Sequence, residues 1–250
     1  MNIAILVKNI ETGTDGGDTI ARLNVVTNNY RTNLVKLGSY LERLASGNAS
    51  GIEGSNSVIV GGSTNAYGTI TLSSTGPVAT NTFTLNGVTF TAIAAKTGTY
   101  ARAGNVITVS ITSHGMTTGQ KVYLDFTSGD AIDKVYEVTV LNSGSYTVVD
   151  TETGTTSGNV TQSTGSQFSI GGSLTATAAN IAGSISASVS DAISGVVTAS
   201  SSAGVVTITA NAPGKLGNGN TLAAGTFANG AFVNFSSSGT KGIEALNVSF

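Results

Sequence analysis

The sequence predicts a mainly β protein: a small α+β sandwich module with an inserted β barrel or sandwich domain, preceded by a long N-terminal helix. Three observations lead to this fold class. Short stretches alternate threonine with aliphatic or aromatic residues, as strands with one buried face do. Glycine supplies 33 of the 250 residues and marks frequent turns. One N-terminal stretch instead repeats its apolar residues at spacings of three and four.

The composition restricts the partners of the chain. It has 11 basic and 13 acidic residues, and only 10% of its residues are charged, against a usual quarter. We therefore expect no nucleic-acid partner and no membrane partner. The longest apolar run, Ile3 to Val7, is too short for a bilayer span or a signal-peptide core, so we expect a soluble protein. Without cysteine there is no disulfide and no thiolate site.

Residues 1–49 are predicted to form a short strand and a heptad helix over 18–46. Asp18 is a suitable N-cap, and Gly47 follows the last periodic residue, where a helix commonly ends. The apolar seam also includes the polar Thr27, and we expect its other members to form an oligomer interface: Ile20, Leu23, Tyr30, Leu34, Leu37, Leu41 and Leu44. The seam either packs on the chain's own β domain or forms a coiled coil between copies. Because it is confined to a and d positions, we favour the coiled coil.

Residues 50–66 are predicted to be a linker or arm, and residues 67–95 plus 164–224 an outer β module. The Asn86-Gly87 pair indicates a type I′ hairpin turn, and Ser173 is the expected N-cap of a helix over 173–190. The strands expected in this module are 69–72, 82–85, 88–91, 167–170, 195–199 and 205–209, with Pro213-Gly214 closing the last hairpin. This order predicts one helix covering an antiparallel sheet.

Residues 96–163 are predicted to be a small β domain inserted into a loop of the outer module. Its turns recur about every ten residues, as in small barrels and sandwiches. Its expected strands are 105–109, 121–126, 135–140 and 145–149. Residues 225–250 alternate only weakly and are expected to form a C-terminal arm that adds an edge strand to a neighbouring subunit.

Candidate chemistry is sparse, and we assign no catalytic, cofactor-binding or metal-binding residue. His114, the single histidine, lies in a Ser-His-Gly turn without a nucleophile motif. Asp125, Asp130 and Asp133 do not match an EF-hand loop, and a solvated loop is favoured over a cation site. The segment Gly214–Gly219 lacks the spacing of a phosphate loop and is expected to be a turn. Four tyrosines could form a sugar-stacking face, but their strand spacing favours the core of the inserted domain: Tyr100, Tyr123, Tyr136 and Tyr146.

Several strings resemble β modules of tailed-bacteriophage virion proteins. The outer-module strings are Asn81 to Ala92, Phe168 to Gly172, Thr175 to Ala182, Val205 to Gly214 and Gly217-Asn218. The inserted-domain strings, Ser113 to Gly119 and Val122 to Gly129, are similar to a second module of phage structural proteins. Together the two resemblances cover about two-thirds of the chain, and the heptad helix lies outside them.

The resemblance implies a structural component of a virion without an enzymatic role. We favour a capsid decoration, or cement, protein that binds the major capsid protein on the outer capsid surface. The alternative is a tail, neck or fibre protein, and the second alternative is a carbohydrate-binding module. Leucine at both a and d does not select between two and three strands. Because capsid lattices and fibres offer threefold axes, we expect a homotrimer.

Overall fold

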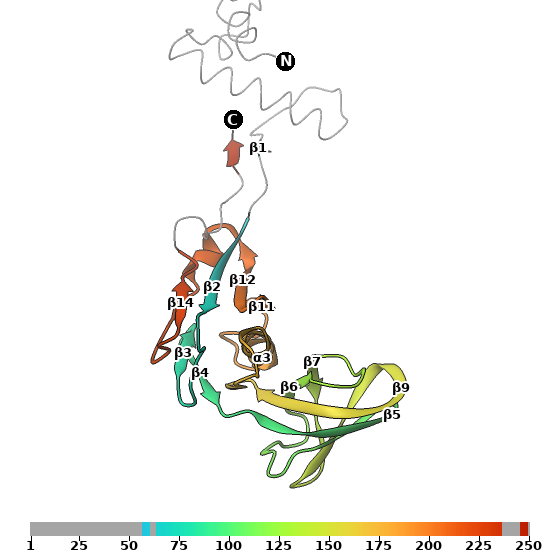
Figure 1. The fold of residues 1–250 in the computed structure, drawn as a ribbon. Coiled ribbons are helices and arrows are strands. Elements are labelled where there is room, and N and C mark those ends of the chain that lie inside the picture. Colours follow the sequence, from blue (N-terminus) through green and yellow to red (C-terminus); the bar gives the residue numbers. More distant parts are fainter. Residues whose placement is uncertain (1–56, 61–63, 237–245, 250) are drawn as a thin grey trace, which may run out of the picture. The chain divides into compact units, whose positions relative to one another are not determined.

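The computed structural model describes residues 57–60, 64–236 and 246–249 (Figure 1). This part of the chain is mainly β, with several sheets and one α-helix, as the sequence predicts. The predicted strand and heptad helix within residues 1–49 lie outside the described residues. The chain divides into two compact units, one holding residues 64–243 and the other both chain ends.

In the unit that holds the chain ends, two strands far apart in sequence pair with each other. Strand β1 (Ser57–Val60) runs antiparallel to β15 (Leu246–Ser249). The register places Val58 opposite Val248 and Val60 opposite Leu246. The predicted linker and the predicted C-terminal arm therefore each contribute a strand to one ribbon within a single chain.

The outer module of the larger unit is built from two four-stranded sheets. The first, here the β2 sheet, has the order β11 (Val197–Ser202), β12 (Val205–Pro213), β2 (Asn65–Leu72) and β14 (Gly230–Val233). The second, the β3 sheet, has the order β10 (Gln167–Ser169), β4 (Val88–Ile93), β3 (Thr82–Leu85) and β13 (Leu222–Ala223). The two sheets and the helix share one hydrophobic core.

Both hairpins of the outer module turn through two residues with positive φ, but only one of the two turns was predicted correctly. Asn86 and Gly87 have φ of 49° and 79°, which confirms the type I′ turn between β3 and β4. The hairpin of β11 and β12 is closed by Ala203 and Gly204, with φ of 48° and 81°, and not by Pro213-Gly214. Ala-Gly is a weaker turn signal than Asn-Gly, so the sequence did not single it out. Pro213 instead ends β12 before the 3₁₀ helix η1 (Gly214–Gly219).

Two further features of the outer module differ from the prediction. Strand β10 pairs with β4 in the parallel direction, so the β3 sheet is mixed and not purely antiparallel. Strand β14, from the predicted C-terminal arm, pairs with β2 of its own chain and not with a neighbouring subunit. This pairing buries part of Phe232 against the core, which stabilises the strand in place.

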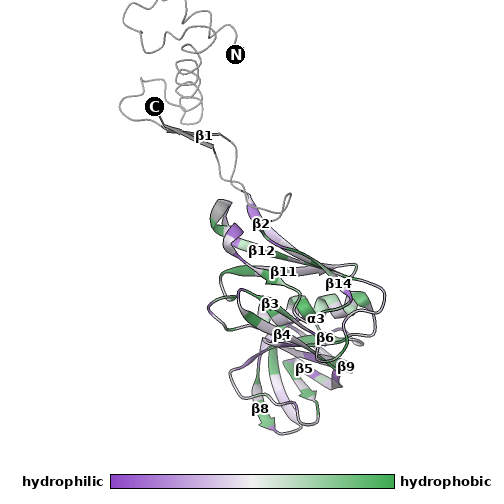
Figure 2. Cartoon of the chain, turned by 90° about the vertical axis from the view of Figure 1, so that its left-hand side faces the viewer, coloured by the Kyte–Doolittle hydropathy of each residue, from purple (hydrophilic) through white to green (hydrophobic). Residues whose placement is uncertain are grey.

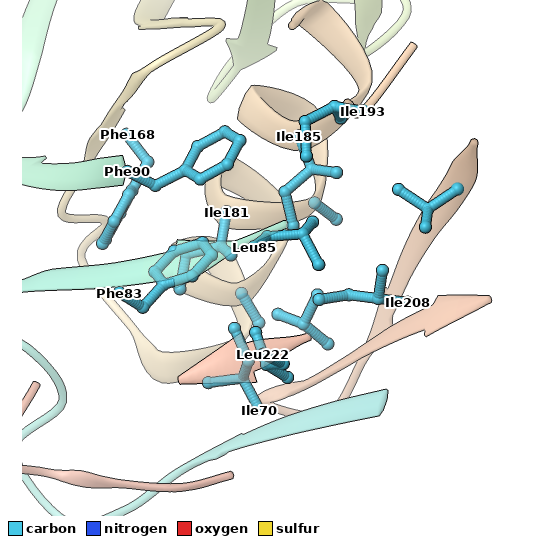
Figure 3. Packing of buried hydrophobic residues seen from close by; sticks show 14 of the residues in the cluster. Ile70, Phe83, Leu85, Phe90, Phe168, Ile181, Ile185, Ile193, Ile208 and Leu222 are labelled. Carbon is cyan, nitrogen blue, oxygen red and sulfur yellow. The ribbon is translucent and has the colours of Figure 1, made fainter. Parts of the chain in front are cut away.

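Helix α3 (Leu174–Ala187) begins where the sequence predicts and ends three residues early. The Ser173 hydroxyl accepts a hydrogen bond from the backbone N–H of Ala176, which confirms the N-cap. Ala178, Ile181 and Ile185 are buried in the core, where Phe83 and Phe90 stack with ring centroids 5.0 Å apart (Figure 3). Ser188 adopts an extended backbone, so Val189 lies beyond the helix and is 73% exposed.

The chain between β4 and β10 forms one five-stranded antiparallel sheet with a hydrophobic cluster of its own, and neither a closed barrel nor a two-sheet sandwich. Its strands are β5 (Lys96–Ser110), β6 (Lys121–Phe126), β7 (Lys134–Glu137), β8 (Thr139–Asn142) and β9 (Ser145–Thr164). Strand β9 pairs with β5 along one edge, while β8 and β6 pair with opposite ends of its other edge. Figure 1 shows β5 and β9 as two long curved strands that run side by side.

Helix α3 joins the two sheets of the outer module to the inserted sheet. Tyr123 on β6 lies against Gly183 of the helix, and the Ser184 hydroxyl donates a hydrogen bond to the carbonyl oxygen of Thr164. A buried hydrogen bond from the Ser169 hydroxyl to the carbonyl oxygen of Gln162, 2.6 Å long, ties β10 to β9. The helix therefore contributes one face to the outer core and another to the junction.

Candidate functional site

The predicted oligomer interface lies outside the described residues. All seven of its residues belong to 1–56: Ile20, Leu23, Tyr30, Leu34, Leu37, Leu41 and Leu44. The sites that the structure does describe are the single histidine, the tyrosines, the aspartates and a buried ionic cluster.

His114 is buried in the inserted sheet with both ring nitrogens hydrogen-bonded. Its Nδ1 accepts from the backbone N–H of Met116 at 3.0 Å, so Nε2 is the atom that carries a proton for the carbonyl oxygen of Asn142 at 2.7 Å. The ring also meets Tyr146 edge to face, with centroids 5.1 Å apart. Because both ring nitrogens are hydrogen-bonded, the imidazole has a structural role: it holds the segment before β6 against the inserted sheet.

All four tyrosines are buried and do not form an exposed sugar-stacking face, and three of them lie in the core of the inserted sheet as predicted. Tyr100, Tyr136 and Tyr146 belong to the cluster of the inserted sheet, and the Tyr146 hydroxyl donates to the side-chain oxygen of Gln162. Tyr123 is the exception, because its ring packs on Gly183 of α3 at the junction. Burial raises the pKa of both Tyr123 and Tyr146 above its ordinary value.

A buried ionic cluster at Arg102, Asp150 and Lys134 is the most charged feature of the described interior. Lys134 Nζ lies 2.6 Å from Asp150 Oδ1, and Arg102 Nη2 lies 3.5 Å from Asp150 Oδ2. Burial by itself raises the pKa of Asp150, but hydrogen bonds from Lys134 and from backbone N–H groups outweigh it and hold that pKa below its usual value. The sequence did not single out this cluster, although alternation along β5 places Arg102 on the same buried face as Tyr100.

Two of the three aspartates considered as cation ligands contact other parts of the inserted sheet, and the third is a half-buried carboxyl on β6. Asp133 Oδ1 accepts a hydrogen bond from the backbone N–H of Phe126 at 2.7 Å, and Asp130 lies 4.0 Å from Arg102. Burial and the nearby Asp133 carboxylate raise the pKa of Asp125 to about 6. Within the described ranges, no group of three or more histidine or acidic side chains is placed to hold a metal ion.

A cleft of roughly 710 Å³ lies between the inserted sheet and the outer module. Its lining includes Met116, Lys121, Gln167 and Val189, together with several glycine and serine residues. The segment Gly214–Gly219, predicted to be a turn, is the 3₁₀ helix η1. In the part of the chain that the structure covers, none of the helices has the length and apolarity to cross a membrane.

Comparison with known proteins gave no match: no family model, no curated protein and no solved structure is similar to this chain.

Proposed function

We propose that this protein is a non-enzymatic structural component of a tailed-bacteriophage virion, built from two β modules. The observation that carries the proposal is where the phage-like strings lie. Their apolar residues are core residues, including Phe83, Phe168 and Ile208, each with no exposed surface. Their turn residues Asn86 and Gly214 have positive φ. The residues that resemble phage modules are therefore core and turn residues that specify the fold, as expected for a β module that occurs in several virion proteins.

Within the virion, we propose a capsid decoration protein that binds the major capsid protein and stabilises the shell. The buried charges support a passive building block, because Asp150 is engaged by Lys134 and Arg102 inside the sheet. A homotrimer held by the long N-terminal helix, through the seam at 20–44, would place several copies of the β modules on one capsid site and raise binding by avidity.

The test is to locate the protein on purified particles by cryo-electron microscopy and to compare particles with and without it. We expect density on the outer capsid surface, and heads that assemble without the protein but release DNA at a lower temperature. Density confined to the tail, neck or fibres would replace the decoration role with the alternative. Absence from purified particles would contradict the virion proposal as a whole.

A matched pair of variants tests the seam. Replacing Leu34 and Leu37 by Asp puts two charges in each predicted seam, which is strongly unfavourable in a buried interface. Light scattering should then report monomers where the parent chain gives trimers. The control replaces the off-seam Asn28 and Asn33 by Asp and should leave the trimer intact. A Leu34→Asp, Leu37→Asp chain that stays trimeric contradicts the coiled coil.

A further inference from the structure

The cleft between the inserted sheet and the outer module has the size of a ligand site. Its volume of roughly 710 Å³ lies within the range of about 300–1,000 Å³ that small-molecule sites occupy. Three segments supply most of its lining: residues 115–121 before and at the start of β6, residues 164–167 between β9 and β10, and residues 187–190 at the end of α3. Figure 2 shows α3 beside β6 at this junction.

Several polar side chains of the lining already accept a hydrogen bond from the protein's own backbone. The Thr164 hydroxyl oxygen accepts from the backbone N–H of Gln167 at 3.2 Å. The Ser190 hydroxyl oxygen accepts from the backbone N–H two residues further on, at 3.4 Å. The Gln120 side-chain oxygen accepts from the backbone N–H of Thr117 at 2.9 Å. Because each of these side chains keeps its own protons, what it offers a ligand is chiefly a donor.

The charge of the lining is positive. Among the described residues that line the cleft, Lys121 is the only charged one. The end of α3 adds acceptors, because the carbonyl oxygens of a last helical turn have no partner within the helix. A ligand that fits must therefore be rich in oxygen acceptors, must have some donors of its own, and gains most from a carboxylate near Lys121.

A saccharide meets these conditions better than a peptide does. A peptide bound as an added strand needs free backbone N–H groups. Here the Gly119 N–H donates to the carbonyl oxygen of Val138 at 2.8 Å, and the Gln167 N–H is also engaged. Saccharide hydroxyl groups can instead accept from the side-chain donors and donate to carbonyl oxygens. Met116 and the 73% exposed Val189 give the C–H faces of a sugar ring apolar surface to pack on.

We propose that this cleft binds a saccharide segment that carries a carboxylate, with the carboxylate beside Lys121. The inference adds a ligand-binding role to the structural one and does not depend on where the protein lies in the virion. Binding to a single cleft is weak, because the polar groups of both partners must lose water. Many copies on one particle raise it by avidity.

The experiment first exposes the full chain to a printed panel of neutral and carboxylated saccharides. The carboxylated saccharide that binds best is then titrated by calorimetry beside its carboxyl-reduced form. We expect the reduced form to bind about tenfold more weakly, because a hydrogen bond to a charged group is worth more than a neutral one. An oligomer of glutamate is titrated as a probe of charge alone and should not bind.

Two substitutions of opposite sign test the role of Lys121. Lys121→Gln should lower the affinity for the carboxylated saccharide to that of the reduced form. Glu137 lies directly opposite Lys121 in the register of β6 and β7, so Glu137→Gln removes a carboxylate that repels the ligand. We expect it to raise the affinity about twofold. Neither variant should change the binding of the reduced form.

A bulky side chain tests the place of the site. Gln167 lines the cleft and is exposed, so Gln167→Trp should fill part of the cleft and abolish the binding of both saccharides. Thr89→Trp is the control, because Thr89 is exposed on β4 and does not line the cleft. Circular dichroism melts verify that each variant is folded.

The other outcomes overturn the inference. A parent chain that retains no carboxylated saccharide of the panel has no such site. A Gln167→Trp chain that binds as the parent does places the site elsewhere. Unchanged affinity in Lys121→Gln rules out recognition of the carboxylate at this residue. A glutamate oligomer that binds as tightly as the saccharide would replace the saccharide with an acidic peptide.

Discussion

The ring of Tyr123 on β6 lies directly on Gly183 of α3, so closely that a Cβ at position 183 would overlap the ring atoms. The inserted sheet and the outer module therefore meet at a point where only glycine fits. Gly183 is also fully within the helix, where glycine is otherwise unfavourable by about 1 kcal/mol relative to alanine.

We predict that Gly183→Ala destabilises the protein despite the better helix propensity of alanine. Overpacking of a buried contact costs about 1–3 kcal/mol, which exceeds the propensity gain. Gly172→Ala is the control, because no atom lies within 4 Å of the added Cβ. Denaturant unfolding of both variants measures the effect. In a Tyr123→Ala background the cost of Gly183→Ala should largely vanish, and an unchanged cost would mean that the ring is not what limits position 183.

The ionic cluster gives a second prediction. Asp150→Asn removes the negative charge between Lys134 and Arg102, whose side chain is only 2% exposed. Breaking such a buried arrangement costs about 3–5 kcal/mol, because a buried cation is left uncompensated. Asp130→Asn is the matched control: its side chain is 68% exposed and 4.0 Å from Arg102, so we expect less than about 1 kcal/mol. Equal effects in urea unfolding would show that Arg102 does not depend on Asp150.

The pH dependence of stability follows from Asp125. Its pKa in the folded protein is raised to about 6 from 3.8, so the folded state binds a proton more tightly than the unfolded state. The fold should therefore gain stability as the pH falls from about 7 to about 4. Below that range, protonation of Asp150, whose pKa is lowered, removes stability again. Melting midpoints should be higher at pH 5 than at pH 7.5, and Asp125→Asn should raise the value at pH 7.5 and flatten the profile. A midpoint that rises with pH in the parent would contradict this assignment.

The inserted sheet can be removed by design. Lys96 lies opposite Gln162 in the ladder of β5 and β9, so an Asn-Gly turn can join these two residues in place of 97–161. The hydrophobic cluster of the outer module contains no residue from the replaced segment, and we expect a cooperative melt at a lower temperature, because α3 loses its contact with Tyr123. Residues 96–164 alone should also fold, since their cluster is self-contained. Non-cooperative melting of both pieces would mean that the two sheets share one core.

Elements with local signals could be predicted from the amino-acid sequence alone. The Asn86-Gly87 turn, the Ser173 N-cap and the buried stripe of Ala178, Ile181 and Ile185 depend on residues within a few positions of one another. Alternation also placed Tyr100, Tyr136 and Tyr146 correctly in the core of the inserted sheet. The same pattern predicted an antiparallel sheet, whereas β10 runs parallel to β4, and it assigned the wrong closing residues to the hairpin of β11 and β12.

Contacts between segments that are distant in the sequence could not be predicted and are seen only in the folded chain. The parallel pairing of β10 with β4, the pairing of β14 with β2, and the charges gathered at Asp150 join residues that are many positions apart. The backbone N–H and C=O groups at the edge of a strand can pair with any other strand. The sequence of one strand therefore does not identify its partner strand. The place of Tyr123 was decided in the same way: its spacing marks it as buried, but only the packing of α3 on β6 sets it against Gly183 and not inside the inserted sheet.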